Sequence, residues 1–244
     1  MSTQSHKRTI QNTGDPQVFF DEERAVTYDD LAIKLVPLLE AKLLAIRFSL
    51  ENLPSDARIL CVGVGTGTEL IHLARCFPCW TFTAVDPAPA MLNVCRSKVK
   101  AAGMETRCNY HEGYLDTLPV ENDYDAATCL LVSHFILDRA GRIAFFRGIA
   151  ARLKPGGVLI SSDLSSDISK PAYQILLRPW LRMLGHSGKT PEEIEGSKAA
   201  YQTQVALLDP VEVETILMAA GFDACVRIYQ NLLIHAWMST SGRS

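Results

Sequence analysis

The chain has 244 residues, a formal net charge of −3 and 48% hydrophobic residues. This length suits one α/β domain with additions, and the apolar content excludes global disorder. The small negative charge excludes a bulk basic surface for nucleic acid, while a local basic patch stays open. The seven cysteines form an odd number without a secretory signal, so free thiols are expected.

The first residues differ in character from the rest. Residues 1–15 are polar, which predicts a flexible N-terminus and no signal peptide, followed by a single domain over residues 16–244. Residues 21–50 carry apolar side chains at helical spacing and predict one or two helices, with Pro37 at a kink or boundary. Their charged residues make this stretch too polar to span a bilayer. We therefore expect a cytoplasmic protein with no membrane association.

Strand and helix patterns alternate through the middle of the chain. The pattern predicts strands at 59–62, 80–85, 106–111, 124–131 and 158–162, with helices at 68–76, 87–103 and 138–153. Two further strands, 224–229 and 232–238, are joined through Gln230 and Asn231, and so short a connection requires an antiparallel pair. The fold class is thus α/β: a Rossmann-like, seven-stranded, mostly parallel sheet with an antiparallel terminal strand and helices on both faces.

Residues 165–208 interrupt this alternation and read as inserted helices with a joint at residues 185–188. Helices placed after the fifth strand could cover the carboxyl end of the sheet as a lid. Tyr173, Arg178 and Tyr201 are then candidate substrate contacts, although the same side chains suit a dimer surface.

A glycine-rich turn follows the first strand at Gly63-Val-Gly-Thr-Gly67. It lacks the Gly-Lys-Ser/Thr of a phosphate-binding loop, and Thr68 stands where a dinucleotide fingerprint needs its third glycine, which disfavours an NAD-dependent oxidoreductase. This spacing better suits S-adenosylmethionine (SAM), because bare glycines let the backbone approach the ligand closely. Asp86, which ends the second strand, would accept hydrogen bonds from both ribose hydroxyls.

From these motifs the chain resembles the class I SAM-dependent methyltransferases along nearly its whole length. Residues 59–67 are similar to the first motif of these enzymes, residues 84–86 to the second, 124–127 to the fourth-strand motif and 153–157 to the turn before strand five. The turn and the resemblance together predict the following cofactor contacts: Gly63, Val64, Gly65, Thr66, Gly67, Asp86, Pro87, Met91, Gly113, Tyr114, Leu115 and Leu130.

Within this superfamily the chain resembles the CmoA branch, in residues 20–37, 86–91 and 197–222. That resemblance implies a homodimer and an enzyme that acts on a wobble uridine of tRNA with carboxy-SAM. Two departures argue against the implied activity. Ala199 stands where the branch reads the extra carboxylate with an arginine, and Leu130 stands in place of an asparagine. We therefore expect ordinary SAM and a small-molecule methyl acceptor, with the tRNA enzyme and a non-catalytic SAM-binding partner protein as alternatives.

Few side chains are candidates for chemistry. His134 follows the fourth strand and is the best-placed general base, although a histidine there could equally be a satisfied surface group. Asp163 follows the fifth strand and could face the substrate or cap a helix. Tyr28 in the entry helix could close over the site.

Other residues keep two interpretations each. Tyr114 could stack on adenine or stay at the rim, with Asp116 as its replacement. Cys76 and Cys79 have the spacing of a zinc pair but no second pair to complete four ligands, so no metal site is expected.

Overall fold

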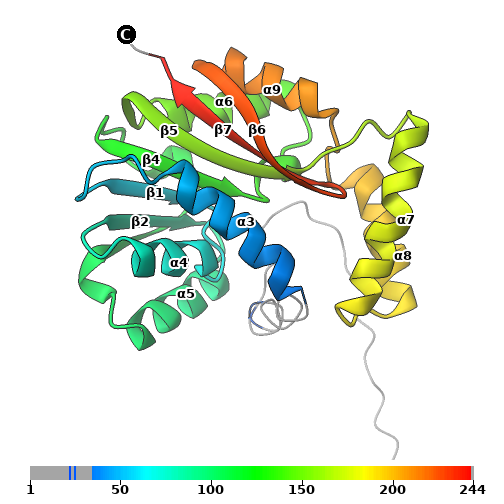
Figure 1. Ribbon diagram of the computed structural model, residues 1–244, viewed down its shortest axis with the longest axis horizontal. Coiled ribbons are helices and arrows are strands. Elements are labelled where there is room, and N and C mark those ends of the chain that lie inside the picture. The colour runs from blue at the N-terminus through cyan, green and yellow to red at the C-terminus, as the bar shows by residue number, and fades with distance from the viewer. Residues whose placement is uncertain (1–21, 23–24, 26–34, 243–244) are drawn as a thin grey trace, which may run out of the picture.

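The computed structural model describes residues 22, 25 and 35–242. A seven-stranded sheet forms its centre, in the order β3-β2-β1-β4-β5-β7-β6 (Figure 1). The strands are β1 (Arg58–Val62), β2 (Thr81–Asp86), β3 (Cys108–Glu112), β4 (Tyr124–Leu130), β5 (Leu153–Leu164), β6 (Phe222–Asn231) and β7 (Ile234–Ser241). β1 to β5 pair in parallel, while β7 runs antiparallel to both β5 and β6. This confirms the expected fold class.

Helices cover both faces of the sheet. Their bounds are α3 (Val36–Ser49), α4 (Thr68–Cys76), α5 (Pro89–Ala101), α6 (Arg139–Ala150), α7 (Pro171–His186), α8 (Pro191–Thr203) and α9 (Pro210–Ala219). Three single 3₁₀ turns are η1 (Glu105–Arg107), η2 (Leu115–Thr117) and η3 (Ser133–Phe135). Pro37 lies in the first turn of α3, where a proline lacks no hydrogen bond that the helix needs, so it marks a boundary. None of the helices among the described residues is both long and apolar enough to cross a bilayer.

Two apolar cores flank the sheet. One joins α3, α4 and α5 to the strands through side chains such as Ile46, Leu70 and Ile59. The other lies under α6 and α9 and contains Phe146 and Trp237. Because both faces are buried, the inner strands are apolar almost throughout, as in other sheets that helices cover on both sides.

The α7–α8 pair lies apart from these cores, beside the end of the β6–β7 hairpin (Figure 1). It has its own cluster of buried side chains, which includes Leu177, Trp180 and Leu233 of the hairpin turn. The inserted segment leaves and rejoins the sheet at one place, since Ser165 bridges to Leu208 and its Oγ donates to the Leu208 carbonyl at 2.7 Å. The two ends of the insertion are therefore held next to each other by this bridge and hydrogen bond.

The turn of the terminal hairpin was placed wrongly from the sequence. Gln230 and Asn231 still belong to β6 and pair with β7, and the chain reverses at Leu232, whose φ is +52°, and Leu233. Leu233 is completely buried in the α7–α8 cluster, and its carbonyl accepts a hydrogen bond from the Ser165 backbone. Tertiary packing thus overrides the turn preference of Gln230 and Asn231.

Candidate functional site

The glycine turn connects β1 to α4 at the carboxyl edge of the sheet. The backbone N–H groups of Gly63 and Val64 both donate to the carbonyl of Val85 in β2, which holds the turn against the neighbouring strand. Gly63, Gly65 and Gly67 have φ values of +64°, +55° and +78°, a region that other residues rarely adopt. The turn is therefore rigid and specific to glycine.

The three glycines differ in how much space a side chain would find at each position. A Cβ at Gly63 would lie 2.4 Å from the side chain of Val132, and a Cβ at Gly67 would lie 2.5 Å from Sγ of Cys95. A Cβ at Gly65 would meet only the terminal methyl of Met91, at 3.4 Å. The outer glycines thus allow protein segments to pack closely, whereas Gly65 presents its backbone where a ligand can approach.

Asp86 ends β2 beside this turn and is buried. One carboxylate oxygen accepts the N–H of Gly65 at 2.8 Å, and the other accepts the N–H of Ala88 at 2.9 Å. Burial raises the pKa of Asp86, and these two hydrogen bonds oppose the rise. Each oxygen keeps one further acceptor position, so the carboxylate can still bind a vicinal diol.

Some of the residues expected to contact the nucleoside lie near Asp86. The N–H of Gly113 donates to the Asp86 carbonyl at 3.0 Å, and Met91 is buried against Ala88 and Ala25. Tyr114 is 44% exposed. Leu115 differs from the expectation, because its side chain is buried in the core on the α6 side with Phe146. It can meet a cofactor through its backbone only.

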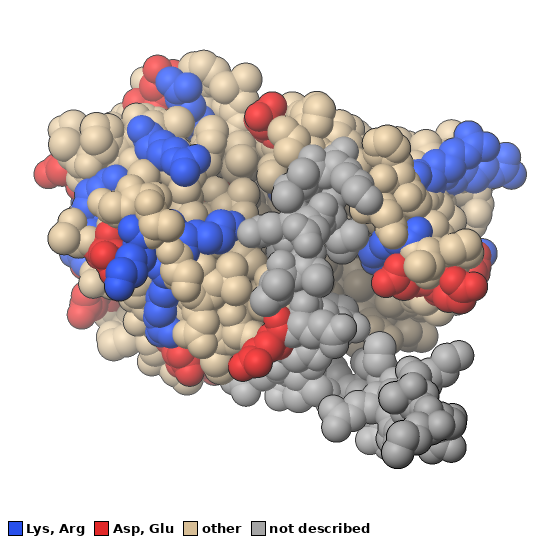
Figure 2. All heavy atoms as spheres, turned by 90° about the horizontal axis from the view of Figure 1, so that it is seen from below, with Lys and Arg blue, Asp and Glu red and all other residues tan. Residues whose placement is uncertain are grey.

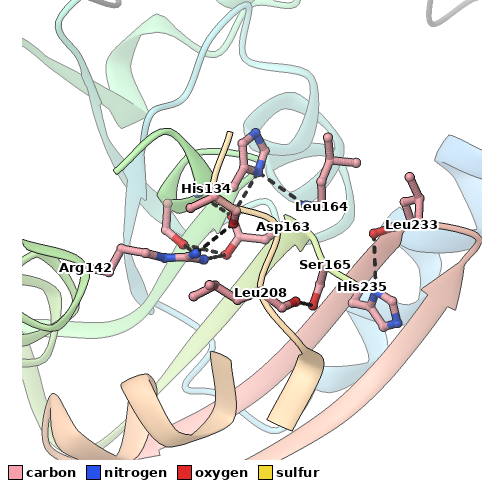
Figure 3. Close-up of polar contacts among 10 residues, drawn as sticks. His134, Arg142, Asp163, Leu164, Ser165, Leu208, Leu233 and His235 are labelled. Carbon is pink, nitrogen blue, oxygen red and sulfur yellow. Dashed lines mark hydrogen bonds and ion pairs between the residues drawn. The ribbon is translucent and has the colours of Figure 1, made fainter. Parts of the chain in front are cut away.

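A buried polar network occupies the ends of β4 and β5. We call its members Ser133, His134, Arg142 and Asp163 the Asp163 cluster. One Asp163 oxygen accepts from Ser133 Oγ at 2.5 Å and Arg142 Nη2 at 2.9 Å, and the other accepts from the His134 backbone at 3.0 Å. The second oxygen also lies 3.1 Å from His134 Nδ1 (Figure 3). All four side chains are almost completely buried.

These contacts decide the charge of Asp163. Burial alone would raise its pKa, but the hydrogen bond of His134, the charge of Arg142 and the Ser133 hydroxyl outweigh burial and lower it. Asp163 is thus a carboxylate anchored on one cation and several donors. Its side chain is completely buried among these partners, and contact with a substrate, one of the two roles weighed from the sequence, stays a prediction.

The Asp163 cluster also fastens the inserted helices. The carbonyl of His134 accepts the N–H of Ala206 at 2.8 Å, and Arg142 Nη1 donates to the Ala206 carbonyl at 3.1 Å. The segment that returns from α8 to the sheet is therefore held by the same residues that hold His134.

The residues just before His134 in the chain lie against the glycine turn. Val132, two residues earlier, packs on Gly63, and Leu131 takes a φ of +61°, which is strained for a branched side chain. Leu130 is half-buried against the α3-side core. The second ring nitrogen of His134 points away from Asp163 and Arg142 (Figure 3), which leaves it available for other chemistry.

The candidates in the inserted helices are not gathered in one place. Tyr173 and Tyr201 are both buried inside the α7–α8 cluster, and the Tyr201 hydroxyl accepts from Trp180 Nε1 at 2.7 Å. Arg178 is exposed on the opposite side of α7. The burial argues against substrate contact by the tyrosines, because their side chains form the internal core of the pair. Tyr28 lies outside the described residues.

Two buried charged residues escaped the sequence analysis. Lys42 of α3 and Glu69 of α4 are each only 9% exposed. Burial raises the pKa of Glu69 to about 7, against a hydrogen bond from its own backbone N–H and the charges of Lys42 and Lys98, while Asp86 adds to the rise. Burial lowers the pKa of Lys42. The sequence did carry a signal, since Lys42 shares a helix face with Leu39, Leu43 and Ile46.

Comparison with known proteins agrees with this geometry. A family model described as "Methyltransferase domain" matches residues 59–157. A carboxy-S-adenosyl-L-methionine synthase of Pectobacterium atrosepticum is 27% identical over 225 residues, which cover 88% of this chain and 86% of that protein. A ubiquinone biosynthesis O-methyltransferase of Methylocella silvestris is 30% identical over 144 residues, covering 55% of this chain and 54% of that protein.

The fold has solved counterparts. Human N-acetylserotonin methyltransferase in complex with SAM has a TM-score of 0.63 at 17% identity, with 93% of this chain and 58% of that chain covered. The chain thus spans little more than half of this structure and of the ubiquinone enzyme. Residues 59–157 match a methyltransferase domain, the chain has the fold of a SAM-dependent methyltransferase, and most of its length is similar to carboxy-S-adenosyl-L-methionine synthases.

Proposed function

We propose that this methyltransferase transfers the SAM methyl group to a hydroxyl group of a small molecule, with His134 as the general base. The observation that carries the proposal is the pairing of His134 with Asp163 beside the glycine turn. The cofactor contacts proposed for Gly63 to Gly67, Asp86 and Gly113 are supported by the open face of Gly65 and the free acceptor positions of Asp86.

The contacts of the imidazole favour one tautomer. Nδ1 lies 3.1 Å from Asp163 Oδ1, and the backbone N–H of Leu164 donates toward the same nitrogen at 3.3 Å. A carboxylate can only accept, and a deprotonated Nδ1 would place two lone pairs against each other. The N–H of Leu164 would instead favour an unprotonated Nδ1. Because the contact to the carboxylate is shorter and involves a charge, we propose that the proton sits on Nδ1 and that Nε2 is left as an acceptor. Asp163 positions the ring in this state.

A proton acceptor at this place suits methyl transfer to a hydroxyl. Bound SAM supplies a methyl group made electrophilic by its positive sulfur. His134 Nε2 takes the proton of the acceptor hydroxyl as its oxygen attacks in line, and S-adenosylhomocysteine leaves with the electron pair of the broken S–C bond. The protein must mainly align the acceptor and exclude water. The almost complete burial of His134 supports that exclusion.

The kind of acceptor is supported from two directions. The relative from Methylocella silvestris is named as an O-methyltransferase, and so is a fatty-acid enzyme of Mycolicibacterium smegmatis. On the face drawn in Figure 2, the described Lys and Arg side chains are interspersed with acidic ones rather than forming one continuous basic surface. We therefore propose a small-molecule acceptor chosen by the α7–α8 pair as a lid, and no nucleic acid partner.

The test compares His134→Ala with His186→Ala, a change at an exposed histidine. Formation of S-adenosylhomocysteine is followed with a panel of phenols and hydroxy acids. We expect His134→Ala to lower kcat by about 100-fold or more while SAM affinity is kept, since general bases contribute 10²–10⁴. Equal turnover in the variant and the wild type would rule out the base. SAM binding without turnover on any acceptor would instead favour the non-catalytic alternative.

A second candidate is the synthesis of carboxy-SAM. Relatives with that name cover 88% and 84% of this chain, against 55% and 72% for the two O-methyltransferases. Because these relatives are named for making carboxy-SAM, the alternative function becomes the synthesis of carboxy-SAM, in place of the use of carboxy-SAM on tRNA. Against it, Ala199 is exposed on α8 and offers no cation for a second carboxylate. Mass spectrometry of the nucleoside carried through purification separates the two, because carboxy-SAM differs from SAM in mass.

We further propose a cytoplasmic homodimer, from the lack of a membrane-directed pattern in the sequence and from the likeness to the CmoA branch. Light scattering on the purified protein tests the dimer, and cell fractionation tests the location.

A further inference from the structure

Lys42 and Glu69 form a buried pair that is not neutralised by contact. In the described part of the chain, neither head group hydrogen-bonds to another residue, and no ion pair joins them, although each acts on the other through its charge. In the Asp163 cluster, by contrast, every charge touches its partner. Two buried opposite charges without a contact partner can both be neutralised by a ligand that carries the two complementary charges.

Keeping such a pair is costly for the free protein. Burial without direct partners disfavours both ionised forms, and the opposite shifts in the pKa of the two groups express this cost. A ligand with a carboxylate for Lys42 and an ammonium for Glu69 would remove it. An α-amino acid head group has this pattern of charges.

The place of the pair fits one end of the cofactor. Glu69 stands two residues beyond Gly67, and its charge acts on Cys61 of β1 and Cys129 of β4. Asp86 lies on β2, one strand away in the sheet order. A SAM molecule with its ribose at Asp86 would therefore have β1, the glycine turn and Glu69 beside its amino acid end.

We propose that Lys42 and Glu69 bind the zwitterionic amino acid head group of the cofactor, with the lysine on its carboxylate and the glutamate on its ammonium. This assignment rests on the proposed function, because it needs SAM in the glycine turn. It adds two side chains from α3 and α4 to a site otherwise built from turns at the strand ends.

Two nucleosides separate the two ends of the site in a calorimetric test. S-adenosylhomocysteine keeps the amino acid head group, whereas 5′-methylthioadenosine lacks it. We expect Lys42→Met and Glu69→Gln each to weaken S-adenosylhomocysteine at least tenfold and to leave 5′-methylthioadenosine within twofold. Asp86→Ala should weaken both ligands. The exposed Glu40→Gln and Lys100→Met serve as controls and should change neither affinity.

Each other outcome has a definite meaning. Unchanged S-adenosylhomocysteine affinity in both buried variants, or an equal loss of both nucleosides, would overturn the head-group assignment. Retained 5′-methylthioadenosine binding shows that a variant is folded, and the near-isosteric Glu69→Gln carries the test if Lys42→Met does not fold. A wild-type protein that binds neither nucleoside would instead overturn the proposed SAM site itself.

Discussion

The Asp163 cluster and the Lys42–Glu69 pair place charges at similar depth but treat them in opposite ways. Asp163 touches a cation and several donors within 3.1 Å, and the pKa of its carboxyl is lowered. Glu69 has no partner of this kind in the described chain, and its pKa is raised to about 7. One cluster is complete without a ligand, and the other is not.

This difference separates structural from binding roles for buried charge. A network with all its hydrogen bonds made holds the protein together, and removing a member leaves its partners unpaired. A charge buried without partners weakens the free protein and gains its partner from outside. Three changes test this distinction, and the first two should have opposite signs.

The largest effect is expected for Asp163→Asn. The change leaves the Arg142 guanidinium buried without its counter-charge, and breaking such a pair costs about 3–5 kcal/mol of unfolding free energy. Because the folded pKa lies below the ordinary 3.8, this stability is present at neutral pH and is lost as pH falls through the folded value. Urea unfolding at several pH values measures it. Asp167→Asn removes a half-buried carboxylate that contacts Ser169 and Lys170 near the surface, so it should shift the midpoint much less, and similar midpoints for both variants would contradict the structural role.

Glu69→Gln should change stability in the other direction. The folded pKa of about 7 exceeds the ordinary 4.5, so ionising Glu69 costs stability as pH rises between these values. In cofactor-free protein at pH 8, the variant should therefore be more stable by up to about 3 kcal/mol, with no gain at pH 4. Urea titrations at pH 4 and 8 check this, with Glu40→Gln as the exposed control. A destabilised variant at pH 8 would show that the carboxylate already has a partner.

The smallest effect belongs to Ser133→Ala. It removes one donor to Asp163 while Arg142 and His134 remain, so we expect a loss of about 1–2 kcal/mol. Ser169→Ala is the matched control, because its hydroxyl makes the same contact to Asp167 at an exposed position. Equal losses in the two variants would mean that burial does not strengthen the Asp163 cluster.

The parts of the site that could be predicted from the sequence are local in the chain. Gly63, Gly65 and Gly67 follow a strand and open a helix, and Asp86 ends the next strand, so neighbouring residues alone reveal them. His134 and Asp163 were found as candidates because each follows a strand at the same edge of the sheet. Their contact could not be predicted, since it depends on how two loops meet.

The missed residues act across long distances in sequence. Arg142 reaches Asp163 from α6, and the charge of Lys42 comes near that of Glu69 only when α3 packs on α4. The helix pattern does place Lys42 on an apolar face, but no local pattern shows which residue a buried charge will approach. The position of the hairpin turn was predicted wrongly for the same reason, because the burial of Leu233 depends on the inserted helices.

The base of the inserted segment has a practical consequence for changing acceptor preference. Since Ser165 and Leu208 are bonded to each other, helices between them could be exchanged as one cassette without altering the sheet. Ala206 lies inside that cassette. Its backbone N–H donates to the His134 carbonyl, and its own carbonyl accepts from Arg142. A transplanted segment must therefore place a backbone N–H and carbonyl at the position of Ala206. Otherwise the contacts to His134 and Arg142 are lost, and the proposed base is disturbed together with the acceptor preference.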